Sequence, residues 1–112
     1  MSPTYREDDM MRLIALLNLK PGISVESYEQ WARTVDLPTV NALPSIGRFD
    51  LFRATGQLGT DATPPYQYVE IIDVDDMEQF GRDAATDRMQ AVAAAFQDMA
   101  DVTFLTTEQV HP

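Results

Sequence analysis

Two charged residues interrupt apolar segments that we expect to form the two strands of a hairpin. Arg53 lies in the segment 48–55 and Glu70 in the segment 66–74. In one of the two possible pairing parities, their side chains share a sheet face, one diagonal step apart. A buried carboxyl group has a shifted pKa, so the pair could bind a polar substrate or move a proton. The structural alternative is an ion pair within the chain or at a dimer interface, because buried charges need partners.

Four aromatic residues could form a wall for a flat ligand. Tyr28 and Trp31 share one face of a predicted helix. Tyr66 and Tyr68 follow on the second strand of the hairpin. Aromatic side chains combine a large apolar surface with a polar tip, which suits an aromatic small molecule. Packing in the core is the alternative role of Trp31.

Three polar residues stand close to the ends of predicted elements. Asn18 ends an apolar strand and Asp36 ends the first helix, so both could direct polar atoms into a cavity between sheet and helices. Asn41 follows Pro38, which disfavours helical geometry at the preceding residue and should stop the helix near Asp36. We group Asp36 with the charged pair as a candidate catalytic residue, and the two asparagines with the aromatic residues as candidate substrate-binding residues. The alternatives are a turn-forming role for Asn18 and a solvent-facing cap at Asp36.

The charge of the chain excludes several classes of partner. Of its 112 residues, 18 are acidic and 8 are basic, which gives a formal net charge of −10. Because there is no basic cluster, the chain would repel nucleic acid and an anionic membrane surface. No apolar run approaches the ~20 residues that cross a bilayer, and residues 1–10 lack the apolar core of a signal peptide. We therefore expect a cytoplasmic protein.

The sequence contains no motif that would hold a cofactor or a metal ion. It has no cysteine, and its acidic groups at 7–9 and 73–76 lack the spacing of a calcium loop. It also has no glycine-rich phosphate loop, GxSxG elbow or histidine-containing triad, and the single histidine, His111, stands next to the C-terminus. The chemistry that remains is a cofactor-independent reaction.

Hydrophobic periodicity predicts one α+β domain over residues 11–112, preceded by a flexible extension over residues 1–10. The domain begins with a strand at 12–19 that is apolar on both faces. A helix capped by Ser24 follows, with Glu29 and Arg33 paired on its outer face.

The second half of the domain completes the pattern. After the hairpin we expect a short helix with a capping box at Asp75, a helix capped by Thr86 and a final strand at 102–107. The resulting order is the ferredoxin-like split βαβ arrangement, with an antiparallel four-stranded sheet and helices on one face.

The strands are apolar on more faces than one layer of helices can cover. The first strand is apolar on both faces, and Val69 and Ile71 alternate with Tyr68 and Ile72 on the hairpin. The uncovered sheet face of a second copy is the simplest cover, so we expect a homodimer with an isologous interface, a dimeric α+β barrel. The alternative is a monomer with an exposed aromatic patch.

Five segments of the chain carry a resemblance to a known family. RLIALLNLKPG, DLPTVNALPS, FRATG, PPYQYVEIIDV and MQAVAAAF occur in this order between about Arg12 and Glu108. Together they resemble the RedY/HapK-like proteins of bacterial pigment and bisindole biosynthesis. The resemblance implies a ferredoxin-like fold in a dimeric α+β barrel and a role in tailoring aromatic or pyrrole-type metabolites, where some members act as cyclases.

These observations lead to one functional expectation and two rivals. The protein is expected to hold a small aromatic metabolite and to promote a cofactor-free cyclisation or condensation through shape and acid–base groups. One rival is a non-catalytic accessory protein that shelters a reactive intermediate. The other is a monooxygenase or isomerase on the same barrel, because a fold does not decide a function.

Overall fold

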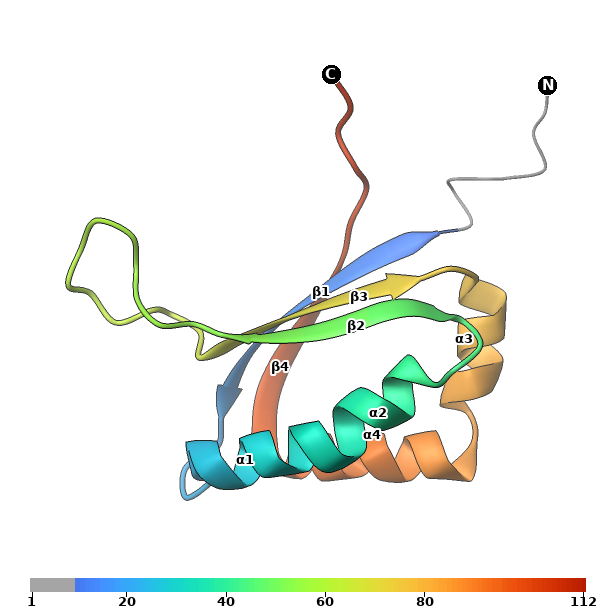
Figure 1. The fold of residues 1–112 in the computed structure, drawn as a ribbon, viewed down its shortest axis with the longest axis horizontal. Helices are drawn as coiled ribbons and strands as arrows, with labels where there is room; N and C mark the ends of the chain where they lie inside the picture. The colour runs from blue at the N-terminus through green and yellow to red at the C-terminus, as the bar shows by residue number, and fades with distance from the viewer. Residues whose placement is uncertain (1–9) are drawn as a thin grey trace.

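The computed structural model describes residues 10–112, so the extension expected over residues 1–10 lies almost wholly outside the described residues. Its centre is an antiparallel four-stranded sheet with the strand order β2-β3-β1-β4 (Figure 1). The strands are β1 Met11–Leu19, β2 Ile46–Arg53, β3 Tyr68–Val74 and β4 Ala100–Thr106. With the helices between β1 and β2 and between β3 and β4, this order confirms the ferredoxin-like α+β prediction.

The helices cover one face of the sheet (Figure 1). They are α1 Val25–Trp31, the π-helical turn η2 Ala32–Asp36, α2 Leu37–Asn41, α3 Met77–Ala84 and α4 Asp87–Met99. The hydroxyl groups of Ser24 and Thr86 cap α1 and α4, as predicted. The cap of α3 is Asp76 rather than Asp75, and its carboxylate accepts hydrogen bonds from the N–H groups of Glu78 and Gln79.

The prediction that Pro38 stops the first helix is wrong. Leu37 keeps helical dihedral angles, and its N–H donates to the carbonyl of Ala32, five residues earlier. Proline lacks an N–H and collides with the carbonyl four residues before it in a regular α-helix. The π turn widens the helix ahead of the proline and accommodates the ring. The helical run therefore continues to Asn41, with Asp36 buried in its middle.

The strand register decides which side chains face the helices. Leu13, Ala15 and Leu17 of β1 are buried on this face, opposite Ile72, Glu70 and Tyr68 of β3. One core cluster lies near α2 and the other near α1 and α4. The first contains Leu13, Val40, Ile46, Phe49, Ile72 and Val74, and the second Leu17, Tyr28, Tyr68, Phe96 and Ala100.

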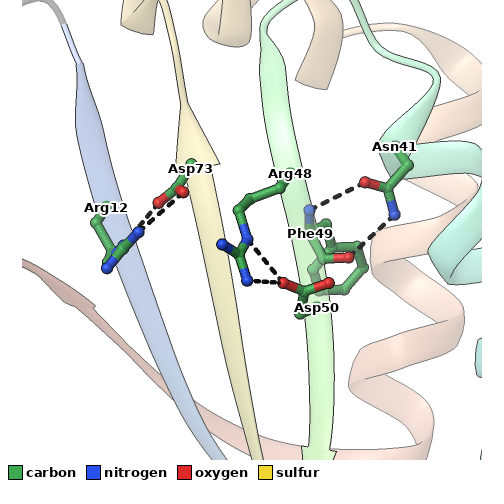
Figure 2. Close-up of polar contacts among 6 residues, drawn as sticks. All are labelled: Arg12, Asn41, Arg48, Phe49, Asp50 and Asp73. Carbon is green, nitrogen blue, oxygen red and sulfur yellow. Dashed lines mark hydrogen bonds and ion pairs between the residues drawn. The ribbon is translucent and has the colours of Figure 1, made fainter.

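The other sheet face is open in the single chain. It carries Ile14 and Leu16 of β1 and Val69 and Ile71 of β3, flanked by exposed Phe52 and Leu105. At one end, charged pairs border this apolar area: Arg12 reaches Asp73 on the neighbouring strand, and Arg48 reaches Asp50 along β2 (Figure 2). The prediction that β1 and β3 are apolar on both faces is thus confirmed.

Candidate functional site

Two carboxyl groups are buried between the helices and the sheet. Glu70 on β3 is 2% exposed and Asp36 in η2 is 6% exposed. The strand neighbours of Glu70 on this face are Ala15 and Leu51, which offer no polar side chain. Among residues 10–112, no side chain forms an ion pair with either carboxyl group. Both acids therefore lack the compensation that buried charges usually need.

Burial changes the acidity of both groups. It raises the pKa of Glu70 to about 8, and the nearby Asp36 carboxyl group adds to this rise. Burial also raises the pKa of Asp36 to about 7. Because both values lie near neutrality, these carboxyl groups can hold or release protons under ordinary conditions. Two such acids side by side suit proton transfer to and from a substrate.

The hydroxyl group of Tyr28 belongs to the same region. It is fully buried and has no hydrogen-bond partner within the described part of the chain. Burial raises the pKa of Tyr28, and Glu70 and Asp36 raise it further. The tyrosine therefore stays neutral, with a hydrogen-bond donor that nothing satisfies. We call Tyr28, Asp36 and Glu70 the buried acid cluster.

A second polar group bridges the helices and the sheet. The Glu29 carboxylate accepts from Arg53 Nε at 2.6 Å, Arg53 Nη2 at 2.8 Å and the Tyr68 hydroxyl at 2.7 Å. Arg33 Nη2 donates to it as well, at 3.0 Å. Hydrogen bonds from Arg53 and Tyr68 lower the pKa of Glu29 to about 2, so it is ionised at neutral pH. We call these four residues the Glu29 clamp.

A cavity of about 220 Å³ lies at the Glu29 clamp. Its lining consists of the four clamp residues together with the apolar side chains Ala32, Leu37 and Leu51. Leu51 is the direct cross-strand partner of Glu70, and Leu37 follows Asp36 in the chain. Leu37 and Leu51 are thus neighbours of the two buried acids, but Tyr28, Asp36 and Glu70 do not themselves line the cavity. A separate groove of about 320 Å³ lies between α2 and the start of α4, where Arg88 donates to Thr39.

Three of the four predicted wall residues come together. The ring centroids of Tyr28 and Tyr68 are 4.9 Å apart, and those of Tyr28 and Trp31 are 6.2 Å apart. Phe96 of α4 stacks on Trp31 at 6.3 Å, with an angle of 6° between the ring planes. Tyr66 lies before β3, partly exposed, and is not part of this group.

The predicted pairing of Arg53 with Glu70 is wrong, although the predicted geometry of the strands is right. Arg53 stands opposite Tyr68 and Leu51 stands opposite Glu70, so the charged residues share a face one diagonal step apart. The guanidinium group turns toward Glu29 on α1 instead. The Glu29–Arg33 pair also exists, but it is part of this interior contact rather than a pair confined to the outer face.

Neither asparagine lines the cavity. Asn18 is on the open sheet face, where its side chain bonds the backbone of Pro65 and Gln67 and holds the β2–β3 loop. The expectation that it shares a cavity with Asp36 is therefore wrong. Asn41 exchanges hydrogen bonds with the N–H and C=O of Phe49 (Figure 2), which ties the end of α2 to β2. Its amide group also donates to Leu37, so these contacts engage both ends of the amide.

Sequence reasoning missed the central role of Glu29 and the part of Phe96. Glu29 directly follows Tyr28, whose side chain is buried, and it could have been read as lying at the edge of the buried helix face. No sequence signal shows that Arg53, 24 residues later, reaches it. The spacing of Val92 and Phe96 puts Phe96 on the apolar face of its helix, but its stacking on Trp31 depends on how α1 and α4 pack.

Two further properties of the described residues bear on function. No group of three or more His, Cys, Asp or Glu side chains in residues 10–112 is arranged to hold a metal ion. Over the same residues, none of the helices has the length and apolar character needed to cross a membrane.

Comparisons with known proteins agree on one family and one fold. Residues 11–110 match the family model of the REDY-like protein HapK. The crystal structure of HapK from Hahella chejuensis is similar, with 34% sequence identity, a TM-score of 0.73, and coverage of 91% of this chain and 94% of that chain. None of the proteins with curated descriptions matches the sequence.

More distant structures share the fold. SnoaB, described as a cofactor-independent oxygenase from Streptomyces nogalater, is 19% identical over 93% of this chain and 96% of its own, with a TM-score of 0.67. A dimeric ferredoxin-like protein of unknown function from Thermobifida fusca is 20% identical over 89% and 91% of the two chains, with a TM-score of 0.65. At these identities the likeness concerns the fold alone.

Proposed function

The chain belongs to the family of REDY-like HapK proteins, and from this premise we propose that it acts on an aromatic intermediate of secondary metabolism. The intermediate is of the indole or pyrrole type, and the reaction is a cofactor-free cyclisation or condensation. We place this activity in the cytoplasm.

The buried acid cluster is the observation that carries the proposal. In a ring-closing condensation, a base removes one proton from the attacking atom. An acid delivers one proton to the departing oxygen, or to the carbon on which negative charge develops. Asp36 and Glu70, whose pKa values lie near neutrality, can serve as the base and the acid in either direction. The unpaired Tyr28 hydroxyl can donate a hydrogen bond to an oxygen that gains negative charge.

The aromatic residues supply the binding surface in this proposal. The cavity adjoins Tyr68, and through it the ring of Tyr28, which in turn lies against Trp31. A flat heteroaromatic compound gains apolar contact and favourable ring geometry there. Its orientation relative to Glu70 and Asp36 would then determine which atom loses a proton.

A second copy of the chain is the proposed cover of the open sheet face. Exposed Phe52 and Leu105 flank a contiguous apolar area on β1 and β3, which is costly to leave in water. An isologous contact would bury this area twice, once on each protomer. The likeness to a dimeric ferredoxin-like protein supports the same arrangement.

Turnover assays with bisindole and bipyrrole intermediates test the proposal. We expect product formation without added metal or cofactor, together with saturable quenching of Trp31 fluorescence by the substrate. Saturable binding without turnover would identify the non-catalytic accessory protein instead. Consumption of O₂ in step with substrate would identify an oxygenase, the activity named for the structurally similar SnoaB. Linear quenching, with no turnover of either substrate class, would contradict the proposal.

A further inference from the structure

Two arginines share one carboxylate at the mouth of the cavity. The charged side chains that line it are Arg33, Arg53 and Glu29, so the cavity lining carries one surplus positive charge. This surplus stands out in a chain with a formal net charge of −10. On the open sheet face, by contrast, Arg12 and Arg48 each pair with a carboxylate of their own (Figure 2).

Both guanidinium groups keep donors for a further partner. Arg53 uses Nε and Nη2 on Glu29, and Arg33 uses Nη2. Neither Nη1 atom takes part in the hydrogen bonds to Glu29, and both side chains are more than half exposed. Guanidinium groups favour planar, bidentate contacts with carboxylates, so two of them beside a cavity form a suitable anion-binding edge.

The rest of the cavity lining has a different character. Ala32, Leu37 and Leu51 are apolar, and Leu51 lies directly across from Glu70. A ligand that fits both parts of this lining has an apolar ring and an anionic group. Below pH 7, where the pKa values of about 7 for Asp36 and about 8 for Glu70 leave both acids mainly protonated, they add little repulsion.

We propose that the ligand of this cavity is a flat aromatic compound that bears a carboxylate, with the carboxylate bound by Arg33 and Arg53 and the ring packed on the apolar side chains of the lining. This inference rests on the proposed function and specifies its substrate class. Arg53 is then a substrate-binding residue. Arg33 determines the preference for an anion, because its removal would leave the cavity lining without a surplus positive charge.

The test compares two probes that differ only in charge. Indole-2-carboxylate and indole-2-carboxamide share one ring, and calorimetry at pH 6 gives the Kd of each for the full chain. We expect the wild type to bind the carboxylate ~10-fold more tightly than the amide, a typical effect of a charge-assisted contact. In Arg33→Gln the two Kd values should converge, with the amide affinity unchanged. Arg33→Lys should retain most of the preference.

The matched control is Arg82→Gln, which removes the same charge from α3, where Arg82 bonds only the Gln79 side chain. Its probe preference should equal that of the wild type. Equal binding of both probes by the wild type, or a preference that survives Arg33→Gln, would overturn the carboxylate inference and leave the aromatic site intact. If neither probe binds, the aromatic ligand of the proposed function falls, and the inference falls with it.

Discussion

Arg53 donates two hydrogen bonds to Glu29, from Nε at 2.6 Å and from Nη2 at 2.8 Å, and so joins the edge strand of the sheet to the first helix. Glu70, on the same sheet face, has no basic partner among residues 10–112. The arrangement separates two functions that a single Arg53–Glu70 pair would have combined. The Glu29 carboxylate lines the cavity and stays ionised, with a pKa lowered to about 2, whereas the buried Glu70 carboxyl group has a pKa raised to about 8.

A pair of double-mutant cycles tests this separation. The free energies of unfolding of Arg53→Met with Glu29→Gln should be non-additive, because each single change removes the same contact. Those of Arg53→Met with Glu70→Gln should add, because these side chains form no ion pair. Chemical denaturation of the wild type, the three single variants and the two double variants measures both couplings. Strong coupling in the second cycle would show that Arg53 and Glu70 interact after all.

Removal of the Tyr68 hydroxyl should destabilise the protein measurably. This buried group donates to Glu29 at 2.7 Å, so Tyr68→Phe loses one hydrogen bond to a charged acceptor, worth about 1–2 kcal/mol. Tyr66→Phe is the matched control, because Tyr66 lies in the preceding loop and is partly exposed. Its free energy of unfolding should stay within about 0.5 kcal/mol of the wild type. Equal effects of both variants would argue against the Glu29 clamp.

The fold could be predicted from the sequence because its signals are local. The helix face through Tyr28 and Ala32, and the caps at Ser24 and Thr86, depend on spacing along a single element. The prediction failed at Pro38, where a proline that usually ends a helix is accommodated by a π turn. That accommodation leaves Asp36 buried inside a helical run instead of at its end.

The candidate site was predictable only in part, because it depends on contacts between elements. The alternation of β3 places Glu70 on the same face as Tyr68, and this much follows from the sequence. The choice of Glu29 as the partner of Arg53 depends on the position of α1 over the sheet. The same applies to the approach of Asp36 to Glu70, since helix and strand are far apart in the chain.

The stability of the folded protein should fall as the pH rises from about 5 to about 8. The pKa of Glu70 is about 8 when folded against an ordinary value of 4.5, and that of Asp36 is about 7 against 3.8. Between these limits the unfolded chain releases protons that the folded chain retains, so stability decreases with pH. For Glu70 the loss amounts to roughly 3 kcal/mol.

Glu70→Gln checks this origin, because glutamine does not titrate. Denaturation from pH 5 to pH 9 should give a flatter profile for the variant than for the wild type. Glu29, with its pKa lowered to about 2, contributes in the opposite sense, because its stabilisation is lost as the pH falls below about 4. A wild-type profile that is flat or rises between pH 5 and pH 8 would contradict the burial of two protonated acids.

The proposed dimer predicts different outcomes for two neighbouring substitutions on β4. Leu105 is 42% exposed on the open sheet face, and Phe104 is 52% exposed on the helix side, where it contacts Phe96. Leu105→Asp should weaken the dimer more than ~100-fold, because it places an unpaired charge in the interface. Phe104→Asp should lower stability and leave the dimer intact. Light scattering at protein concentrations of about 1 to 100 micromolar measures the mass of the assembly. A monomer mass for the wild type at every concentration would refute the dimer.

The last prediction separates catalysis from binding at Glu70. Glu70→Gln keeps the size of the side chain and its ability to form hydrogen bonds, but it removes the acidic proton of the carboxyl group. Turnover should therefore fall by roughly 10²–10⁴-fold. The fold and substrate affinity should persist, because glutamine adds no charge to a site where the acid is already largely neutral. Saturable quenching of Trp31 fluorescence reports the affinity. Asp50→Asn serves as the control, because Asp50 pairs with Arg48 on the open sheet face. A Glu70→Gln variant that binds normally and turns over at the wild-type rate would remove Glu70 from the mechanism. The same measurements on Asp36→Asn would then show whether Asp36 is the acid that moves the proton.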